Sequence, residues 1–597
     1  MQATPMEAAA GDNIAALNMG SIGGAQAAAM QPIKAFVVGV DTRGRTMQES
    51  EVNSRLQDPL AALMLKLVPA SERPQNLDTT VEFIVNASPA DKFDFMTFLA
   101  GEGGQMRWTE ETKDLDRALR FLWVRFPRTA TGSRDQADIL VVGSALGFAD
   151  DAIFLQCASW DVANRTYNFY KRLNGEWFWA GQSHMAFDPA TRLQGPFDGH
   201  VNGNLVMKEL TPPWNNWHSS VAGISETALP PSHPLRTHPL FTGKEVANKL
   251  QTLVVQPAID RFTSARIDSL VQGAKLTGVK LLINQILATA TVNFVSSAER
   301  SKQRFTKNEY DLPPGFFLDI ESLSAAGIVA GDTSKLRVSY QKYQDSLTEY
   351  DFRLQAGAFA QKGDTFFAFF VPAPAKEDVV LLQQLIDRGI VTKRLAACLM
   401  MVDLANPVYS DHRRRLAQYA PDEIQYSAAT RSSDLEALLA PAIVAAAKGA
   451  PEDSAEAEFA ANWAIPEADY AAAFQQRVDA YLAAVSARLT EEPNEPFFQY
   501  TELADSRRRE FARTKLAEFA LTLPVTKIAA TASFLEMRPD GTVQRKPAGA
   551  LTGAFVFIPE TSSPAEKAAA NLDRSGEQVA SPSFDQLAPE KVHWACK

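Results

Sequence analysis

The sequence YNFYKRLNGEWFWAG, which runs from Tyr167 to Gly181, predicts a β-hairpin. Two runs rich in aromatic residues flank the dipeptide Asn174-Gly175. Asn-Gly between such runs is the strongest short-range hairpin signal, because both central residues of the turn need a positive φ. We expect three strands in this part of the chain, at 152–160, 165–173 and 176–180.

Hydrophobic periodicity predicts further elements on both sides of the hairpin. Before it we expect a buried strand in the run KAFVVGVD, an amphipathic helix near 56–67, a strand at Val81–Val85, a helix at Asp114–Trp123 and a strand at Ile139–Gly143. After residue 242 the pattern changes to helices, at about 242–257, 279–295, 336–350, 376–388, 392–403, 470–485 and 502–519, with one buried strand at 365–371. The fold class is therefore α+β. A strand-containing N-terminal domain with a long irregular segment rich in His and Trp is followed by a mostly α-helical C-terminal region.

Length and composition indicate a globular protein of several domains. A chain of 597 residues is too long for one core and suggests roughly two to four domains. Its residues are 46% hydrophobic and 22% charged, as is usual for globular proteins. We divide the chain into a flexible N-terminal segment (1–32), an α+β domain (33–241), a mainly helical domain (242–420), an Ala-rich helical region (421–560) and a tail predicted to be disordered (561–597).

Charge, cysteine content and hydropathy restrict the location and the partners. The net charge of −11 argues against a nucleic-acid-binding protein that works through overall charge. Cys157, Cys398 and Cys596 are far apart and odd in number, which indicates a reducing compartment rather than a disulfide framework. The N-terminus lacks a secretory signal, and polar residues interrupt the longest apolar stretch, at 280–295. We therefore expect a cytoplasmic protein, with neither nucleic acid nor membrane among its partners.

The segment from Ala152 to Phe241 is rich in histidine and tryptophan. It holds five of the seven histidines and five of the nine tryptophans. After Gly181, eight prolines exclude long helices and central strands. A long irregular segment in a compact domain is usually functional or mobile, and the aromatic content favours a functional one.

Three histidines of this segment, His184, His200 and His218, are the candidate metal ligands, because imidazole is the commonest side-chain ligand of Zn, Fe and Cu and also binds haem iron. Asp198 is suited to accept a hydrogen bond from an imidazole N–H and so orient the ring. Trp214 and Trp217 lie beside two prolines and are expected to line the cofactor pocket, whereas Trp177 and Trp179 of the hairpin are expected to pack in the core. The alternative for each histidine is that it caps or bridges loop backbone, since no helical spacing such as H-E-x-x-H accompanies them.

The stretch GPFDGHVNG (195–203), followed by LVMKEL and PPWNNWH, carries a resemblance to a known family. Residues 195–218 resemble the haem-attachment loop of bacterial c-type cytochromes, in which C-x-x-C-H precedes an irregular segment that contains proline. Only His200 matches this pattern, because Pro196 and Gly199 stand where the two thiols would be. Covalent haem is therefore excluded, and the resemblance leaves two interpretations: a haem bound without covalent attachment, with His200 as its ligand, or an ancestral haem loop that has taken another use.

Other motifs are absent or open to a simple interpretation. Dinucleotide-binding, P-loop and nucleophile-elbow patterns do not occur, so these classes of enzyme have no support. Two D-x-R-R-R segments occur, at Asp411–Arg415 and Asp505–Arg509. Guanidinium clusters suit carboxylate or phosphate recognition. The simpler interpretation is an Asp near a helix start with solvated or salt-bridged arginines behind it.

These observations give two hypotheses of different classes. In the first, the protein is an oxidoreductase for a small-molecule substrate that uses haem or a single transition metal. His200 and His218 are then the ligands or acid–base groups, and His184 is the third candidate. In the second, the protein is a non-catalytic binding or scaffold protein, whose loops form an aromatic recognition surface and whose Arg clusters dock an acidic partner. An absorption spectrum with metal analysis distinguishes the two.

Overall fold

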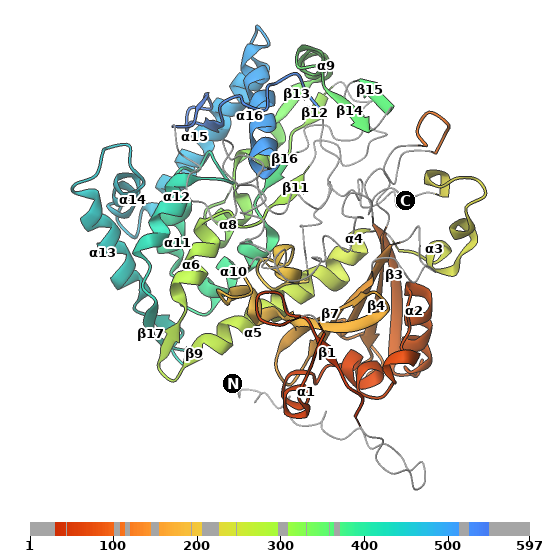
Figure 1. The fold of residues 1–597 in the computed structure, drawn as a ribbon. Helices are drawn as coiled ribbons and strands as arrows, with labels where there is room; N and C mark the ends of the chain where they lie inside the picture. Colours follow the sequence, from red (N-terminus) through yellow and green to blue (C-terminus); the bar gives the residue numbers. More distant parts are fainter. Residues whose placement is uncertain are drawn as a thin grey trace, which may run out of the picture.

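The computed structural model describes residues 30–42, 44–100, 108–113, 120–144, 155–192, 194–205, 226–245, 247–295, 309–329, 331–356, 359–362, 371–512 and 525–547. Two parts lie side by side in it (Figure 1): a sheet with its covering helices, drawn mainly in red and orange, and a larger helical part, drawn in green to blue. Helix α5 (Gln256–Leu270) contacts both, because it packs on the sheet and on a helix of the larger part. The fold is α+β, as the sequence predicts.

The N-terminal part is built on an eight-stranded sheet. Its strands are β1 (Lys34–Ala35), β2 (Arg45–Thr46), β3 (Phe93–Ala100), β4 (Arg120–Pro127), β5 (Ile139–Ser144), β6 (Leu155–Asp161), β7 (Thr166–Leu173) and β8 (Glu176–Gln182). Their order is β2-β1-β8-β7-β6-β5-β4-β3, so β3 to β8 form an antiparallel meander. β1 joins the sheet parallel to β8. The predicted hairpin is confirmed, because Asn174 and Gly175 have φ angles of 50° and 78°.

Helices cover both faces of this sheet. On one face pack α1 (Glu49–Arg55), the π-helix η1 (Ala61–Leu65) and α2 (Leu77–Asn86). On the other pack α4 (Ala247–Leu250), the π-helix η7 (Gln251–Val255) and α5. Because both faces are covered, β7 is buried along its whole length. Trp177 and Trp179 lie in the core of the first face, as expected, and donate their indole N–H groups to Pro74 O at 2.7 Å and Asn168 Oδ1 at 2.9 Å.

Three expectations for this part of the chain are wrong. Val81–Val85, expected as a strand, belongs to α2, whose start is capped by Asn76 through a 2.9 Å bond from the backbone N–H of Thr79. Of the helix expected at 114–123, the described residues from Arg120 on belong to β4. Residues 30–32, expected in the flexible N-terminal segment, are anchored instead, since Gln31 N–H donates to Lys66 O at 3.0 Å.

The described residues of the irregular segment after β8 include five short helical turns. They are the 3-10 helices η3 (Ser183–Phe187), η4 (Gly195–Asp198), η5 (Glu226–Ala228) and η6 (Pro234–Thr237), and α3 (Pro239–Thr242). His233 and His238 cap η6 and α3, each accepting a backbone N–H on its Nδ1 at 3.2 Å. These two histidines therefore cap backbone. This is the role that was the alternative to metal binding for His184, His200 and His218. Residues 206–225 lie outside the described part of the chain.

The larger part is helical, with small sheets of two or four strands among its helices. Its main helices are α6 (Val279–Leu287), α7 (Pro314–Phe317), α8 (Ile320–Ala325), α9 (Tyr340–Glu349), α10 (Lys376–Asp387), α11 (Lys393–Met400), α12 (Asp411–Leu416), α13 (Leu435–Ala447), α14 (Ala455–Trp463), α15 (Tyr470–Thr490) and α16 (Glu495–Ala512). The short strands are β9 (Val271–Gln272), β10 (Lys275–Thr277), β11 (Asn293–Val295), β12 (Glu309–Asp311), β13 (Arg337–Ser339), β14 (Arg353–Ala356), β15 (Phe359–Lys362), β16 (Val371–Ala373), β17 (Glu423–Ser427), β18 (Ser432–Ser433), β19 (Leu535–Met537) and β20 (Val543–Arg545). The helices expected at 376–388, 392–403 and 470–485 are confirmed, whereas the stretch 279–295 divides into α6 and β11.

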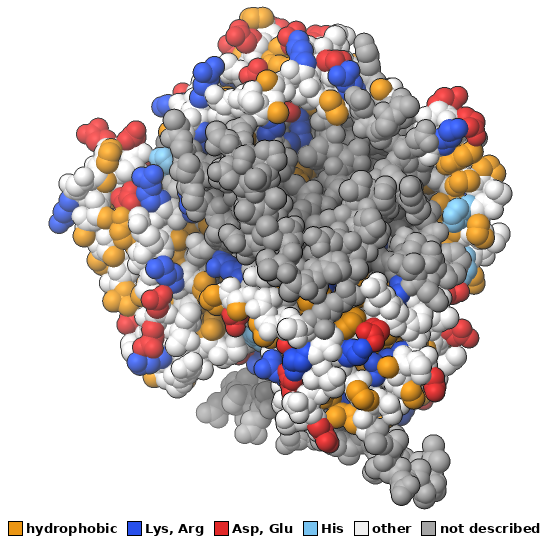
Figure 2. All heavy atoms as spheres, in the orientation of Figure 1, with side chains coloured by type: hydrophobic (Ala, Val, Ile, Leu, Met, Phe, Trp, Pro, Cys, Tyr) orange, Lys and Arg blue, Asp and Glu red, His pale blue; other side chains and the backbone are white. Residues whose placement is uncertain are grey.

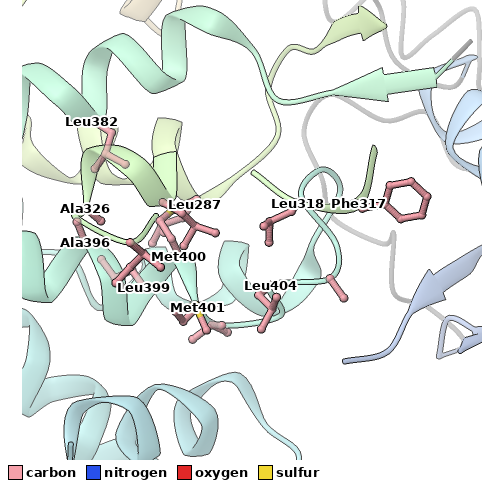
Figure 3. Packing of buried hydrophobic residues seen from close by; sticks show 14 of the residues in the cluster. Leu287, Phe317, Leu318, Ala326, Leu382, Ala396, Leu399, Met400, Met401 and Leu404 are labelled. Carbon is pink, nitrogen blue, oxygen red and sulfur yellow. The ribbon is translucent and has the colours of Figure 1, made fainter. Parts of the chain in front are cut away.

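One hydrophobic core extends through the helical part. It includes residues from Ile267 to Met537, and Figure 3 shows a portion of it, in which Leu287, Leu399 and Met400 meet. Strand β10 pairs with β17, with Leu276 opposite Ile424, so the chain before and after residue 420 shares one sheet and one core. In the part of the chain that the structure describes, no helix is long and apolar enough to cross a membrane.

Candidate functional site

Residues 199–205 follow η4 and form a loop that we call the His200 loop. It passes closely between η3 and α5 at Gly203, which has a φ of +73°. A Cβ atom at this position would lie 2.4 Å from Ser183 O and 2.9 Å from Cε1 of Phe262. Only glycine fits such a passage, so Gly203 fixes the path of the loop toward the helical part.

His200 is held in one tautomer by its own loop. Its Nδ1 lies 2.7 Å from the carbonyl oxygen of Asn204. A carbonyl oxygen can only accept, so Nδ1 carries the proton and, in the neutral ring, Nε2 carries the lone pair. The ring packs against Phe169 of β7, with 4.9 Å between the ring centroids. His200 therefore has a fixed ring orientation and the tautomer that binds metal ions through Nε2.

His184 lies on η3 with its ring at the edge of another aromatic residue, Phe262 of α5, at 5.2 Å between centroids. Burial, and next the charge of Arg266, lower the pKa of His184 below its ordinary value. Its imidazole is therefore neutral at neutral pH. His184 and His200 lie on different turns of the irregular segment, each against the ring of a different phenylalanine.

A buried glutamate connects the His200 loop to helix α10. Both carboxylate oxygens of Glu377 accept a side-chain amide of the loop: Oε1 from Asn202 and Oε2 from Asn204, each at 2.7 Å. Glu377 and both asparagines are buried. Since Asn204 also supplies the carbonyl that holds His200, Glu377 supports the orientation of this histidine through one intervening residue.

Charged and polar groups extend this cluster into the helical part. Arg266 of α5 donates to Gln285 Oε1, and Gln285 Nε2 donates to Asp378 Oδ1 at 2.9 Å. The guanidinium of Arg266 lies over the ring of Phe187, 3.7 Å from its centroid. Burial lowers the pKa of Arg266 to about 9, although the neighbouring carboxylates Glu377 and Asp378 oppose this shift. The cluster thus joins η3, the His200 loop, α5, α6 and α10.

Burial also shifts the two carboxyl groups of the cluster. It raises the pKa of Glu377, although the bonds from the two asparagines oppose the shift. The pKa of Asp378 is raised well above its ordinary value, first by burial and next by the charge of Glu377. Perturbed carboxyl groups of this kind are typical of functional sites and also of buried structural pairs.

Part of the predicted site can be located. His184 and His200 lie in the cluster, and Asp198 ends η4 two residues before His200. Trp214, Trp217 and His218 lie outside the described residues. Glu377, Asn202, Asn204 and Arg266 were not predicted as site residues. The separation of more than 170 residues between the loop and Glu377 gives no spacing signal in the sequence.

Five of the six arginines in the two D-x-R-R-R segments are buried or salt-bridged, and Arg415 is exposed. Arg414 and Arg509 pair with the aspartates of their own segments, at 2.7 Å to Asp411 and 2.9 Å to Asp505. Arg413 and Arg507 are buried and donate to backbone carbonyl oxygens. Arg414 and Arg509 are salt-bridged as expected, whereas Arg413 and Arg507 are more deeply buried than expected. Asp411 begins α12 as expected, but Asp505 lies within α16 and not near its start.

Comparison with known proteins gives no identity. No family model matches the chain, and neither a curated protein nor a solved structure shows significant similarity to it. The described residues also contain no group of three or more His, Cys, Asp or Glu side chains placed to hold a metal ion. What the cluster does is therefore inferred from its own geometry.

Proposed function

We propose that the protein is an oxidoreductase whose cofactor, a haem or a single transition metal, is bound by His200. The observation that carries this proposal is the 2.7 Å bond from His200 Nδ1 to Asn204 O. Metal-ligating histidines usually donate their second N–H to a carboxylate or a backbone carbonyl, which fixes the tautomer and raises the basicity of the ligand nitrogen.

The support of the His200 loop fits this role. The carboxylate of Glu377 accepts a hydrogen bond from the side chains of both Asn202 and Asn204. Gly203 allows the loop to pass close to Ser183. A ligand must be held in place by packing and by bonds to its neighbours, because a loosely held imidazole binds metal weakly. The loop meets that condition although it contains no helix or strand.

The two cofactors make different demands on the chain. A haem needs only one axial histidine, so His200 can fill this role without a second protein ligand. A mononuclear metal needs two or more further protein ligands. His184 and His218 are the candidates for these, and His218 is also the second acid–base candidate, but it lies outside the described residues. Haem is therefore the better supported of the two, with Trp214 and Trp217 as the proposed lining of its pocket and a small molecule as the substrate in the cytoplasm.

The second candidate function is a binding or scaffold protein without catalysis. The contacts of His184 and His200 with phenylalanine rings and with backbone are also those of a rigid structural loop. The Arg clusters no longer favour this function, because Arg413 and Arg507 are buried and Arg414 and Arg509 are paired. On the face shown in Figure 2, positive and negative side chains of the described residues are interspersed, without a large patch of one sign.

An absorption spectrum and a metal analysis of the freshly purified full chain test the proposal. We expect a Soret band, or one equivalent of a transition metal, either as purified or after incubation with haemin or the metal salt. His200→Ala should lose the bound cofactor while circular dichroism shows a folded protein. His233→Ala, which removes the cap of η6, is the control and should keep the cofactor.

A structural role of His200 predicts a different result. In that case His200→Ala lowers stability by about 1–3 kcal/mol, and the folded fraction binds as much haem or metal as the unchanged chain. That outcome, or a chain that binds neither cofactor under any condition, contradicts the proposal and favours the binding or scaffold function.

A further inference from the structure

Helix α13 carries only apolar side chains between Glu436 and Lys448. A surface helix normally has a polar outer face, and a helix that is apolar all round is normally buried all round. Figure 1 shows α13 at the periphery of the helical part, where it packs beside α14. One side of α13 lies in the core, with Leu435, Leu439 and Ile443 fully buried. The other side has no core to cover it and is nevertheless apolar.

The outer side of α13, which we call the α13 face, consists of Ala437, Leu438, Pro441 and Ala445, all of them exposed. Leu438 is 45% exposed and is the largest side chain on this face. Pro441 has no N–H to donate to the carbonyl oxygen of Ala437 one turn earlier, so a backbone acceptor lies beside the apolar side chains. An exposed apolar face with a polar rim is typical of a protein–protein interface.

Opposite charges flank the α13 face at its two ends. Glu436 lies in the first turn of α13, and Lys448 follows its last residue. Glu436 is fixed at its end of the helix, because one of its oxygens accepts a bond from the hydroxyl of Thr392. The face is therefore an apolar centre with a negative end and a positive end.

This distribution is complementary to itself in one orientation. If two α13 helices pack antiparallel, with their midpoints at Pro441 and Ala442, each Lys448 lies beside Glu436 of the other copy. The same arrangement sets each Leu438 against Ala445 of the other copy, a large side chain against a small one. A parallel arrangement places like charges beside each other at both ends.

We propose that the α13 face binds the same face of a second copy of this chain, in an antiparallel pair of helices related by a two-fold axis. A two-fold contact uses one surface twice, so that surface must be complementary to itself in shape and charge. Ala461 and Ala464, exposed at the end of the neighbouring α14, extend the apolar surface. The contact uses fewer than the roughly 20–30 residues per side of a standard interface, so the dimer should dissociate on dilution.

Sedimentation equilibrium of the full chain over a range of protein concentrations measures the association. We expect an equilibrium between monomer and dimer. Leu438→Glu places a charge at the centre of the contact and should raise the dissociation constant of the dimer by at least about tenfold. Circular dichroism should show a folded protein, because the substituted side chain is exposed in the monomer. Val162→Glu, at a position that is 60% exposed on the turn after β6, is the control and should dimerise as the unchanged chain does.

Cross-linking with a carbodiimide tests the antiparallel orientation, because this reagent joins an amine directly to a carboxylate in contact with it. Within one chain Glu436 and Lys448 are about 18 Å apart along the helix axis, so a cross-link between them forms only between two copies. We expect mass spectrometry to detect it in the unchanged chain and not in Leu438→Glu. Lys448→Glu should raise the dissociation constant by up to about fivefold, and adding Glu436→Lys should reverse that effect.

The proposal is overturned if the chain stays monomeric at every concentration, or if Leu438→Glu and Val162→Glu dimerise equally well. A dimer without the cross-link between Glu436 and Lys448 rules out the antiparallel arrangement. A monomeric chain that binds vesicles of neutral phospholipid, and loses this binding in Leu438→Glu, would assign the α13 face to a membrane surface instead. None of these residues belongs to the cluster around His200, so these outcomes are independent of the proposed function.

Discussion

Arg413 and Arg507 belong to a conspicuous sequence motif, but their side chains stabilise the fold by bonding to backbone carbonyl oxygens. Arg413 donates to Val402 O at 3.2 Å and to Asp403 O at 3.0 Å, and Arg507 donates to Phe316 O and Ala405 O. The loop that they support contains two non-glycine residues in the left-handed region, Asp403 and Tyr409. Such backbone is costly, so it persists only where neighbours hold it in place. The acceptors are main-chain carbonyl oxygens, which every residue type has. The sequence therefore gives no sign of where these arginines bind.

Arg507→Ala should destabilise the protein by about 3 kcal/mol or more. It removes a fully buried side chain and leaves the carbonyls of Phe316 and Ala405 without their charged donor. Urea unfolding of the full chain measures the effect. Arg415→Ala, in the other D-x-R-R-R segment, is the control, because Arg415 is exposed and its loss should cost no more than about 0.5 kcal/mol. Equal effects of the two substitutions would show that Arg507 does not support the loop.

At the scale of single elements, local signals in the sequence predict some parts of the fold well. The Asn174-Gly175 turn and the apolar stripes of α10 and α15 are such signals, and these elements were predicted. The run VEFIV, at 81–85, was misassigned because its residue types favour a strand. The cap at Asn76 and the burial of Leu77, Val81 and Ile84 on one helical face decide its structure instead.

The candidate site was predicted only in part for a similar reason. The density of histidine and glycine near His200 indicated the loop, and the structure places that loop in a polar cluster. Its partners Glu377, Arg266 and Asp378 come from helices that reach the loop only through the packing of the two parts of the chain. Nothing in the sequence around them differs from an ordinary helix with acidic residues in its first turn.

The His200 loop should not tolerate a side chain at Gly203. Gly203→Ala adds a Cβ at a φ of +73° and places it 2.4 Å from Ser183 O, so the backbone must move. Gly273→Ala is the control, because Gly273 has a similar φ of +64° but nothing within 4 Å of its Cβ position. The control should cost about 1–2 kcal/mol for the left-handed conformation alone. Gly203→Ala should cost more and should also increase hydrogen exchange in residues 199–205. Equal costs with an unchanged loop would contradict the close passage.

At the scale of the whole molecule, the ends of the chain are expected to be dispensable. Residues 1–29 and 562–597 lie outside the described part of the chain, and their composition offers little apolar surface to offset the entropy of ordering. A chain that retains residues 30–561 should therefore melt within a few degrees of the full chain. Truncation should stop at residue 29, because Met30 packs on the core and Gln31 is bonded to Lys66. A large fall in melting temperature would show that one of these ends is structural.

The packing of the sheet extends beyond residue 241, where the sequence suggested a domain boundary. Its second face is covered by α5, whose Ile259 and Phe262 are fully buried against residues of the sheet such as Phe169. Each large apolar side chain buried in this way contributes about 1.5–3 kcal/mol. A chain cut after residue 241 would therefore expose one whole face of the sheet to water.

A fragment of residues 30–241 should consequently be insoluble, or soluble without fixed packing, whereas a fragment of residues 30–272 should fold. The longer fragment restores α5, and with it Arg261, whose guanidinium lies 4.2 Å from the ring centroid of Trp160. Near-ultraviolet circular dichroism reports the packing of Trp160, and dye binding reports exposed apolar surface. Ile259→Asp within the longer fragment should reproduce the behaviour of the shorter one, because it removes the apolar contact and leaves the length unchanged. If both fragments fold equally well, the sheet is stable with a single covered face and α5 belongs to the helical part alone.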